Sequence, residues 1–371
     1  PSRLLVVHTA LHGVGWEPLR SVFARAGWPA PLPVRSQERP DPGFPGMPFP
    51  NPEEPGVLGQ AKAAAEQVNA DLVLANDPDA DRLAVIVRGA GGLRTLTGDD
   101  LGALLGDAVL TRLAAGHPIE DPGGLPPVVA TTVVSSSLLR RLADAAGVRC
   151  VSTLTGFKWI VRAGGPRARL IYGYEEALGY AVRPSLVADK DGISAALTVT
   201  ELAEAAAREG RNLLDRLDDL ALAHGLHLTL RRLVPVNSEE GLGSRDKVLE
   251  RARANPPHQF AGHAVTVTDL RRGDPGAADL AGGHAERWPG EPVPPADVLI
   301  WHAGPGARVA VRPSGTEPKL KMYIEAVCPV PARSELPAVR AATRAKAERL
   351  AADALAWLGL DAQARALPHP C

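Results

Sequence analysis

Short apolar strands and helical segments alternate through the first two thirds of the chain, and this order limits the possible folds more than any other feature. A strand-like run at residues 4–7 leads through a glycine-containing turn into a helical stretch at 17–26. A helical segment at 59–68 then precedes an apolar strand at 70–75. Such alternation indicates an α/β sheet, in which ligand sites collect in loops beyond the carboxyl ends of strands.

The same alternation restarts after Gly98, and a different pattern begins after Gly225. Between these glycines the sequence predicts helices at 99–114, 137–146 and 193–208 and strands at 128–134 and 169–172. After Gly225 the order is strand, helix and strand, followed by a β-hairpin, a further strand and a long alanine-rich helix. The sequence therefore predicts three domains: an α/β domain at 1–96, a second α/β domain at 97–223 and an α+β domain at 224–371. Residues 29–55 are dense in proline, and we expect an ordered, extended loop there.

Composition excludes several classes of partner. The 371 residues carry 41 basic and 42 acidic side chains, so no global field attracts nucleic acid or an anionic membrane surface. No apolar stretch approaches the roughly 20 residues of a membrane helix. The three cysteines are an odd number without CxxC spacing, which indicates thiols in a reducing compartment and a cytoplasmic location. We therefore expect neither a nucleic acid nor a membrane partner, and any anion has to be bound locally.

An acidic loop follows the strand at 70–75 directly and contains Asp77, Asp79 and Asp81. Carboxylates at alternate positions in a tight loop can converge on one hard cation, and oxygen ligands of this kind suit Mg²⁺. A solvated acidic turn is the plainer alternative. The position at the end of a buried-type strand favours the metal site, so we predict these three aspartates as Mg²⁺ ligands.

Two other kinds of protein also carry acidic loops of this type. An EF-hand is excluded, because Arg82 stands where that loop needs glycine and Arg88 where it needs a bidentate glutamate. A phosphatase of the haloacid-dehalogenase type, with an aspartate nucleophile after a hydrophobic strand, remains open, although no convincing partner loops follow it.

A second cluster lies between two predicted strands near the C-terminus and consists of Arg312, Ser314, Gly315, Thr316 and Lys319. A guanidinium, two hydroxyls, a closely approachable backbone amide and an ammonium match the oxygens of a phosphomonoester. A simple hairpin turn has a similar composition. The arginine at its head favours phosphate binding, and we expect this cluster to face the acidic loop across a cleft.

Glu175 and Glu176 form a third candidate site in a loop flanked by Tyr174 and Tyr180. Paired acids beside aromatic rings can accept hydrogen bonds from vicinal sugar hydroxyls. Isolated, such a pair is more often surface charge. Lys190 can place a cation near the same ligand, or it can belong to a structural ion pair.

Taken in order, these segments resemble the alpha-D-phosphohexomutase superfamily across nearly the whole chain. The resemblance rests on the metal loop DPDADR, a sugar loop at Thr155, Gly156 and Lys158, the loop YEEALG and the phosphate loop RPSGTEPK. NPEE at residues 51–54 and DKDG at 189–192 are similar to the branch with phosphopentomutase and glucose-1,6-bisphosphate synthase relatives. The resemblance implies two tandem α/β phosphohexomutase-type domains, the family's domains II and III, followed by a C-terminal α+β domain, its domain IV.

The resemblance also implies an activity, in which a phosphoryl group moves between two hydroxyls of one sugar through a bisphosphate. The partners would be a sugar phosphate and a sugar bisphosphate, Mg²⁺ would be the cofactor, and Arg82 and Lys190 are the candidates for catalytic assistance. Both glutamates would hold ring hydroxyls, and the C-terminal cluster would hold the phosphate that is not transferred.

Two departures from the family pattern limit this expectation. No loop has the sequence context of the family's phosphorylated serine, and Ser135, Ser136 and Ser137 lack it. With Pro1 as the first residue, we expect the phosphoserine domain to be missing from this chain, which alone would be inactive, and to act as a separate piece if at all. Ala177 replaces a serine of the hexose-specific loop, so the preferred sugar stays open. A non-catalytic sugar-phosphate-binding fragment and a metal-dependent phosphatase are the alternatives.

Overall fold

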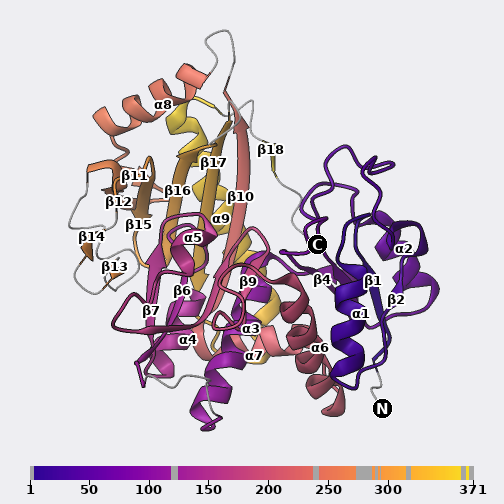
Figure 1. The fold of residues 1–371 in the computed structure, drawn as a ribbon. Coiled ribbons are helices and arrows are strands. Elements are labelled where there is room, and N and C mark those ends of the chain that lie inside the picture. The colour runs from indigo at the N-terminus through magenta and orange to yellow at the C-terminus, as the bar shows by residue number, and fades with distance from the viewer. Residues whose placement is uncertain are drawn as a thin grey trace.

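Of the four sheets in the described residues, the three larger ones organise the molecule, each with its own helices (Figure 1). The computed structural model describes residues 4–117, 124–236, 242–272, 286–288, 291–292, 294–314, 319–360 and 365–366. In Figure 1 the indigo first domain lies to the right, the purple and magenta second domain below, and the orange and yellow third domain above it on the left. This arrangement confirms the predicted fold class of two α/β domains followed by an α+β domain, whereas the exact domain boundaries stay a prediction.

The first domain is a five-stranded sheet in the order β2-β1-β3-β4-β5. β1 pairs in parallel with β2 and β3, and β4 pairs antiparallel with β3 and β5. Its core strands read as apolar runs because both faces are covered, as parallel sheets require. The elements are β1 (Val6–Thr9), α1 (Trp16–Arg25), β2 (Leu32–Pro33), a 3₁₀ turn (Arg35–Gln37), α2 (Gly59–Gln67), β3 (Leu72–Ala75), β4 (Ala84–Gly89) and β5 (Gly92–Thr95).

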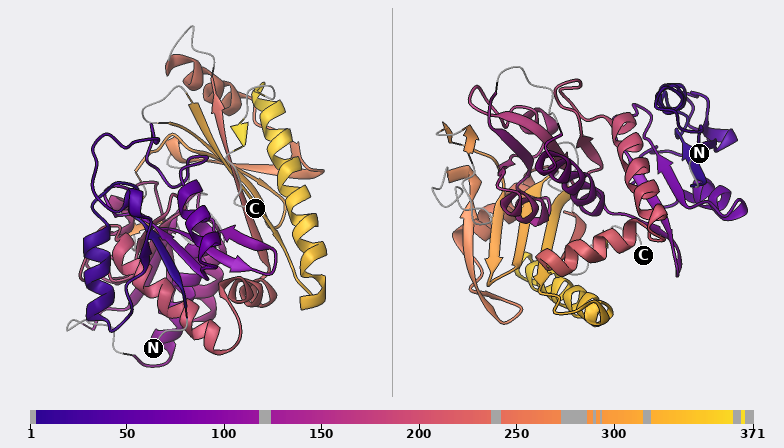
Figure 2. Two further views of the ribbon diagram at one scale, coloured as in Figure 1. Left: turned by 90° about the vertical axis from the view of Figure 1, so that its right-hand side faces the viewer. Right: turned by 90° about the horizontal axis from the view of Figure 1, so that it is seen from below.

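The second domain has a four-stranded sheet in the order β7-β6-β8-β9, in which β6 is parallel to both of its neighbours. Helix α6 contacts α1 and β3 of the first domain as well as helices α3 and α7 of its own, so it joins the two domains (Figure 2). The elements are α3 (Gly98–Ala114), β6 (Pro127–Thr132), α4 (Leu138–Ala145), β7 (Arg149–Thr153), α5 (Phe157–Ile160), β8 (Arg169–Glu175), β9 (Gly179–Ala181), α6 (Gly192–Arg208) and α7 (Leu213–His224).

The third domain is a seven-stranded sheet in the order β11-β12-β15-β16-β17-β10-β18. Helix α9 packs along β10, β16 and β17 and covers one face of the sheet, as the left view of Figure 2 shows. Its elements are β10 (Leu226–Pro235), α8 (Leu242–Ala254), β11 (Gln259–Phe260), β12 (His263–Asp269), a 3₁₀ turn (Leu270–Arg272), the pair β13 (Glu286–Trp288) and β14 (Glu291–Pro292), β15 (Leu299–Ala303), β16 (Ala307–Pro313), β17 (Lys319–Cys328), a 3₁₀ turn (Arg333–Glu335), α9 (Leu336–Leu358) and β18 (Arg365–Ala366).

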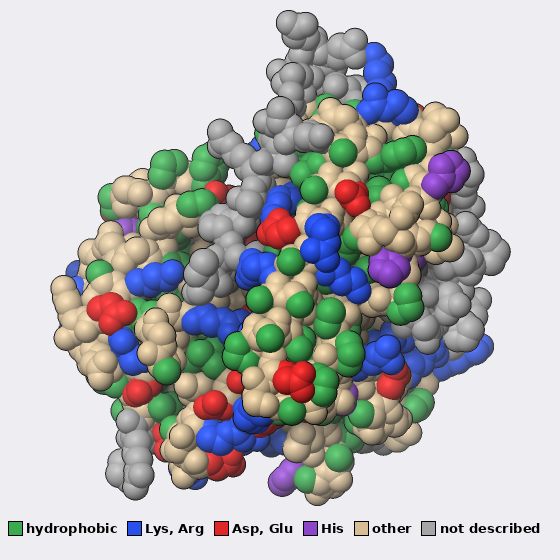
Figure 3. All heavy atoms as spheres, turned by 180° about the vertical axis from the view of Figure 1, so that it is seen from behind, with side chains coloured by type: hydrophobic (Ala, Val, Ile, Leu, Met, Phe, Trp, Pro, Cys, Tyr) green, Lys and Arg blue, Asp and Glu red, His purple; other side chains and the backbone are tan. Residues whose placement is uncertain are grey.

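The surface of the described residues carries charges of both signs. On the face shown in Figure 3, basic and acidic side chains are interspersed among apolar ones. None of the helices in the described ranges has the length and apolar content that crossing a bilayer requires.

Candidate functional site at the junction of the three domains

The acidic loop connects β3 to β4 and lies against the second domain. Leu83 donates its backbone N–H to the carbonyl of Leu178 at 3.1 Å, and Arg82 forms an isolated β-bridge with Gly179. The backbone N–H of Gly192, the first residue of α6, donates to the carbonyl of Ala80 at 3.2 Å. The loop is therefore held by the β8–β9 turn on one side and by the start of α6 on the other.

Inside the acidic loop, hydrogen bonds from side chains satisfy backbone groups that have no partner in a neighbouring strand. Asp77 Oδ1 accepts the backbone N–H of Arg82 at 3.0 Å, and Asn76 Nδ2 donates to the Arg82 carbonyl at 2.7 Å. Asn76 is itself fixed by His8, whose Nε2 lies 3.0 Å from its Oδ1. Ala80 has φ of 58°, a left-handed conformation that is unfavourable for a residue with a Cβ. The loop keeps this strain because the surrounding bonds fix both of its ends.

The acidic loop carries an excess of negative charge that two cations balance in part. Lys190 Nζ lies 2.7 Å from Asp81 Oδ2, and Arg82 Nε lies 3.7 Å from Asp77 Oδ2. Burial raises the pKa of Asp77 to about 6, and the neighbouring Asp81 adds to this, against the opposing effect of the Arg82 N–H. The structure thus brings the predicted catalytic pair, Arg82 and Lys190, to the predicted metal ligands, and gives Lys190 the ion pair considered as its alternative role.

Whether this loop suits Mg²⁺ depends on its donors. Among the described residues, no group of three or more His, Cys, Asp or Glu side chains is already gathered around one point. Asp81 Oδ1 is nevertheless buried without a hydrogen-bond partner in the described part of the chain, with Arg82 Nε 4.0 Å away, and the charge of Asp81 contributes to the raised pKa of Asp77. Unpartnered carboxylate oxygen is what a hard cation requires, so these residues fit Mg²⁺. The assignment of Asp77, Asp79 and Asp81 as its ligands stays a prediction.

Glu175 is the last residue of β8 and Glu176 follows it in the turn, and the two side chains have different surroundings. Burial raises the pKa of Glu175 to about 7, with Glu176 adding to the shift while Lys190 and Arg82 oppose it. Glu176 is buried, and its Oε2 accepts hydrogen bonds from Ser135 Oγ at 2.8 Å and Thr132 Oγ1 at 3.1 Å. Glu175 therefore lies with the charged groups of the acidic loop, whereas Glu176 is held from within the second domain.

The predicted phosphate cluster occupies the turn from β16 to β17. The Arg312 guanidinium lies 5.7 Å from the Tyr323 ring centroid, and its Nη2 donates to the Tyr323 hydroxyl at 3.1 Å. Ser314 is buried, and its backbone N–H donates to the carbonyl of Lys319 at 2.9 Å, which closes the turn. Gly315 and Thr316, the two other predicted phosphate ligands, lie outside the described residues.

The predicted sugar loop at Thr155, Gly156 and Lys158 follows β7. Gly156 has φ of 110°, a conformation open to glycine, and Lys158 Nζ lies 5.5 Å from the ring centroid of Trp159. In the sheet order β7-β6-β8, one strand separates this loop from Glu175. A contact of the loop with sugar stays a prediction.

Charge–charge interactions extend from the acidic loop to residues of β17 near the phosphate cluster, and they run through Glu175 and Glu176. The charges of Arg82 and Lys190 oppose the rise in the pKa of Glu175. The charge of Glu176 in turn acts to raise the pKa values of Lys321 and Tyr323. Burial lowers the pKa of Lys321, and the positive charge of Arg312 lowers it further. These interactions place Glu175 near the acidic loop and Glu176 near β17, whereas the expectation that the phosphate cluster faces the acidic loop across a cleft stays a prediction.

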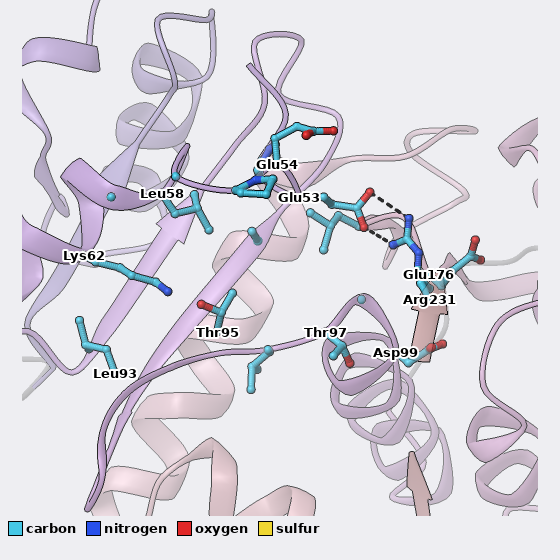
Figure 4. A pocket seen from close by; sticks show the side chains of 18 of the residues that line it. Glu53, Glu54, Leu58, Lys62, Leu93, Thr95, Thr97, Asp99, Glu176 and Arg231 are labelled. Atoms are coloured by element: carbon cyan, nitrogen blue, oxygen red, sulfur yellow. Dashed lines mark hydrogen bonds and ion pairs between the residues drawn. The ribbon is translucent and has the colours of Figure 1, made fainter. Parts of the chain in front are cut away.

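Sequence reasoning missed several charged residues of this region. Arg231 on β10 forms a bidentate ion pair with Glu53 of the first domain, and both point toward each other beside Glu176 in Figure 4. Burial alone would lower the pKa of Arg231, but Glu53 outweighs it and raises that pKa. The pair borders a pocket of about 600 Å³ that is also lined by Leu58, Leu93 and Leu178. NPEE marked Glu53 as a family feature, but no local signal marks Arg231.

Asp99, at the start of α3, is a second missed residue. Its carboxylate accepts the backbone N–H of Ser136 at 2.7 Å, the Tyr174 hydroxyl at 3.0 Å and the Thr229 hydroxyl at 2.8 Å. Burial raises the pKa of Asp99 to about 6, with Glu176 adding to the shift, although the Ser136 N–H opposes it. Asp99 joins the second domain to β10 of the third.

The fold and the site together define a multidomain α/β protein whose acidic loop lies at the junction of its first two domains. Three family profiles match the chain in order: phosphoglucomutase/phosphomannomutase alpha/beta/alpha domain II at residues 1–91, alpha/beta/alpha domain III at 97–221, and the C-terminal domain at 263–342. The chain belongs to the alpha-D-phosphohexomutase superfamily, which confirms the resemblance seen in its motifs.

Named relatives and a solved structure agree with this placement. The chain is 37% identical over 322 residues to a Haemophilus influenzae protein named "Probable phosphomannomutase", covering 86% of this chain and 59% of that protein. It is 34% identical over 350 residues to the phosphopentomutase of Homo sapiens, covering 90% and 55%. The crystal structure of parafusin, a phosphoglucomutase from Paramecium, shares the fold with a TM-score of 0.65 at 17% identity, covering 96% and 58%. The chain thus spans between half and two thirds of the length of these proteins.

Proposed function

We propose that this chain is the substrate-binding part of a phosphosugar mutase that moves a phosphoryl group between the C1 hydroxyl and the C6 or C5 hydroxyl of a hexose or pentose phosphate through a bisphosphate. The observation that supports the proposal is a chain of neighbours: Lys190 pairs with Asp81 and acts on Glu175, while Glu176 acts on Tyr323, which Arg312 contacts. The names of the relatives, phosphomannomutase, phosphopentomutase and phosphoglucomutase, support the same reaction class.

Each group has a distinct task in this proposal. Arg312, Ser314 and Lys319, with Gly315 and Thr316, hold the phosphate that does not react, so that binding energy brings the opposite hydroxyl into line. Glu175 and Glu176 accept hydrogen bonds from ring hydroxyls, and the sugar loop at Thr155, Gly156 and Lys158 contacts the other side of the ring. With its pKa near 7, Glu175 can also exchange a proton with a hydroxyl at neutral pH.

The reacting phosphoryl group needs charge neutralisation more than covalent help. Asp77, Asp79 and Asp81 would hold Mg²⁺, which supplies positive charge for the phosphoryl oxygens. Arg82 is held beside Asp77, and Lys190 beside Asp81, so both cations stand where negative charge develops. Their role is to stabilise that charge and to assist the movement of a proton.

The phosphoryl donor of the proposal is a phosphoserine that this sequence does not contain. The relatives are longer than the chain, and the matched profiles are those of domains II, III and the C-terminal domain. We propose that a further domain, in the same protein or as a separate piece, supplies the serine.

Calorimetric titration with glucose 1-phosphate, mannose 1-phosphate and ribose 1-phosphate in the presence of Mg²⁺ tests the proposal. We expect at least one of them to bind, and Arg312→Ala to weaken that binding by roughly 10- to 100-fold because a charge-assisted bidentate contact is lost. Glu17→Gln, on the exposed face of α1, is the matched control. Failure of all three ligands to bind would reject the proposal, and release of inorganic phosphate dependent on Asp77 would indicate the phosphatase alternative instead.

A further inference from the structure

Three serines in the turn between β6 and α4, Ser135, Ser136 and Ser137, lie where the second and third domains meet. We call this segment the serine turn. It has no part in the function proposed above. It is almost entirely buried, with Ser135 and Ser136 exposed by only 1% and 3%. Buried hydroxyls are retained at a cost unless they are hydrogen-bonded, so their partners indicate what the turn does.

On one side, the serine turn binds a carboxylate of the third domain. Glu325 Oε1, on β17, accepts from the Ser137 backbone N–H at 2.7 Å, from Ser136 Oγ at 2.9 Å and from Ser137 Oγ at 3.0 Å. His227 Nδ1, on β10, lies 3.2 Å from the same oxygen. A buried carboxylate of the third domain thus lies against the residues that directly precede α4 of the second domain.

Arg308 on β16 binds both Glu325 and the serine turn, and we call the Arg308–Glu325 pair the clamp. Its Nε donates to Glu325 Oε2 at 2.9 Å, its Nη1 donates to the Val133 carbonyl at 2.8 Å, and its Nη2 donates to the Ser135 carbonyl. Burial alone would raise the pKa of Glu325, but Arg308 and these donors outweigh it and lower that pKa well below its usual range. Glu325 is therefore ionised at neutral pH, and the clamp is an ion pair with both partners bound to the serine turn.

On its other side, the serine turn binds the glutamate pair. Ser135 Oγ donates to Glu176 Oε2 at 2.8 Å and Thr132 Oγ1 donates to it at 3.1 Å. The two hydroxyls lie 2.8 Å apart, and because each has only one proton, a bond between them competes with one of the bonds to the carboxylate. Thr132 Oγ1 accepts in turn from the backbone N–H groups of Val134 and Ser135 at 3.3 and 3.2 Å. These bonds fix Oε2 of Glu176 and thereby set the direction in which its other oxygen, Oε1, points.

We propose that Ser135 and Thr132 are positioning residues for Glu176, and that the Arg308–Glu325 clamp makes their position depend on docking of the third domain. This inference rests on the proposed function and deepens it. The third domain carries the phosphate cluster and the second domain carries the sugar-binding glutamates. Because the serine turn contacts both, a displaced third domain loosens Glu176, and the sugar is bound well only when the phosphate-binding domain is in place.

A ligand-free measurement tests the coupling itself. Hydrogen exchange of backbone amides in residues 171–182 is compared between the parent chain, Glu325→Gln and Asp218→Asn. Asp218 pairs with Arg340 across the same junction but does not touch the serine turn, so it is the matched control. We expect Glu325→Gln to accelerate exchange in 171–182 by roughly tenfold, the loss of one charge-assisted bond, and Asp218→Asn to leave it unchanged. Equal exchange in all three proteins would overturn the coupling.

A binding measurement then tests the consequence for ligands. Ser135→Ala removes one hydroxyl without changing the clamp, and we expect it to weaken glucose 1-phosphate binding about five- to tenfold while inorganic phosphate binds as in the parent chain. A general structural defect would weaken the binding of glucose 1-phosphate and of inorganic phosphate together. That result would overturn the positioning role of Ser135. If the parent chain binds no sugar phosphate, the proposed function fails, and the exchange experiment still decides whether the serine turn couples the domains.

Discussion

Burial raises the pKa of several carboxyl groups in this protein, and Asp99 is the clearest case. Its pKa is about 6 in the folded chain against an ordinary value of 3.8. A carboxylate whose folded pKa is raised stabilises the fold in its protonated form, so this stability is fully present below pH ~4 and is lost as pH rises through ~6. Asp99→Asn mimics the protonated form, since its amide can donate to the Thr229 hydroxyl. We expect the variant to match the parent near pH 4 and to exceed it by up to about 3 kcal/mol at pH 7.5.

Urea unfolding of both proteins across this pH range measures the effect. Asp41→Asn, an exposed carboxylate in the loop before α2, is the control and keeps the pH profile of the parent. Parallel profiles for Asp99→Asn and the parent would show that Asp99 does not titrate as described.

The acidic loop gives a second prediction at this scale, which concerns the metal. Asp81 has one oxygen paired with Lys190 and the other without a hydrogen-bond partner among the described residues. Replacing Asp81 with Asn removes the charge while keeping the shape of the side chain. We expect Asp81→Asn to weaken Mg²⁺ binding by more than about tenfold in calorimetry, since even outer-shell losses cost this much.

The same Asp41→Asn variant serves as the comparison for Mg²⁺, because it removes one carboxylate from the same domain. Unchanged Mg²⁺ affinity in Asp81→Asn would remove Asp81 from the predicted ligand set. EDTA treatment of the parent chain is expected to abolish any rise in melting temperature that Mg²⁺ produces.

Residues with local neighbours could be predicted from the sequence, and residues with distant partners could not. Asp77, Asp79 and Asp81 stand out because they follow an apolar strand within one loop. Asp99 and Glu325 look like ordinary surface acids, since their partners lie 37 and 188 residues away in the chain. The serine turn was noticed only for lacking a phosphoserine motif, because its role depends on contacts from two domains.

Among the elements, the start of helix α6 is the most tightly constrained. A Cβ on Gly192 would lie 2.3 Å from the Arg82 carbonyl oxygen and 2.7 Å from that of Ala80, and both are backbone atoms. Gly192→Ala therefore has to push α6 away from the acidic loop, at a cost typical of overpacking, about 1–3 kcal/mol. We expect a lower urea midpoint together with weaker Mg²⁺ binding.

Gly59→Ala at the first position of α2 is the matched control for this helix start. Nothing lies within 4 Å of a Cβ there, so alanine is expected to be neutral or to stabilise by roughly 0.5–1 kcal/mol. If Gly192→Ala behaves like Gly59→Ala, the close approach of α6 to the acidic loop is not rigid.

The positions of most longer elements were predictable, whereas β5, β7, β9, α5 and α7 were among those missed; two of these omissions have physical reasons. Strand β7 is a short edge strand that, among the described residues, pairs in its sheet with β6 alone, so its pattern is weak. Helix α7 was missed although its start has a recognisable signal: Asn212 and Asp215 form a capping box. The proline-rich segment was predicted as a loop, and its short strand β2 forms because β1 supplies a parallel partner.

At the scale of the whole molecule, the relative placement of the domains decides whether the site exists, and no sequence pattern gives this placement. The first and third domains meet through Glu53 and Arg231, which are 178 residues apart in the chain. The serine turn joins the second and third domains, and α6 joins the first and second. The motifs indicated candidate side chains in all three domains, and these three junctions fix how the domains that carry them are placed.

The Glu53–Arg231 pair leads to a prediction about how strongly the first and third domains are coupled. Their side chains are 17% and 24% exposed, so each loses most of its hydration and depends on the other for compensation. We expect Glu53→Ala and Arg231→Ala each to destabilise the chain by about 3 kcal/mol, because each leaves a largely buried charge without its partner.

The double variant distinguishes a true interdomain coupling from two separate defects. Removing both charges also removes the uncompensated one, so we expect Glu53→Ala/Arg231→Ala to cost roughly 2 kcal/mol less than the sum of the single changes in urea unfolding. The Glu17–Arg20 pair on α1 is exposed and lies within one helix, and its double-mutant cycle should give less than about 0.5 kcal/mol. Additive costs at Glu53 and Arg231 would mean that the first and third domains are held in place by other contacts, and that the pocket beside this pair can open without breaking an ion pair.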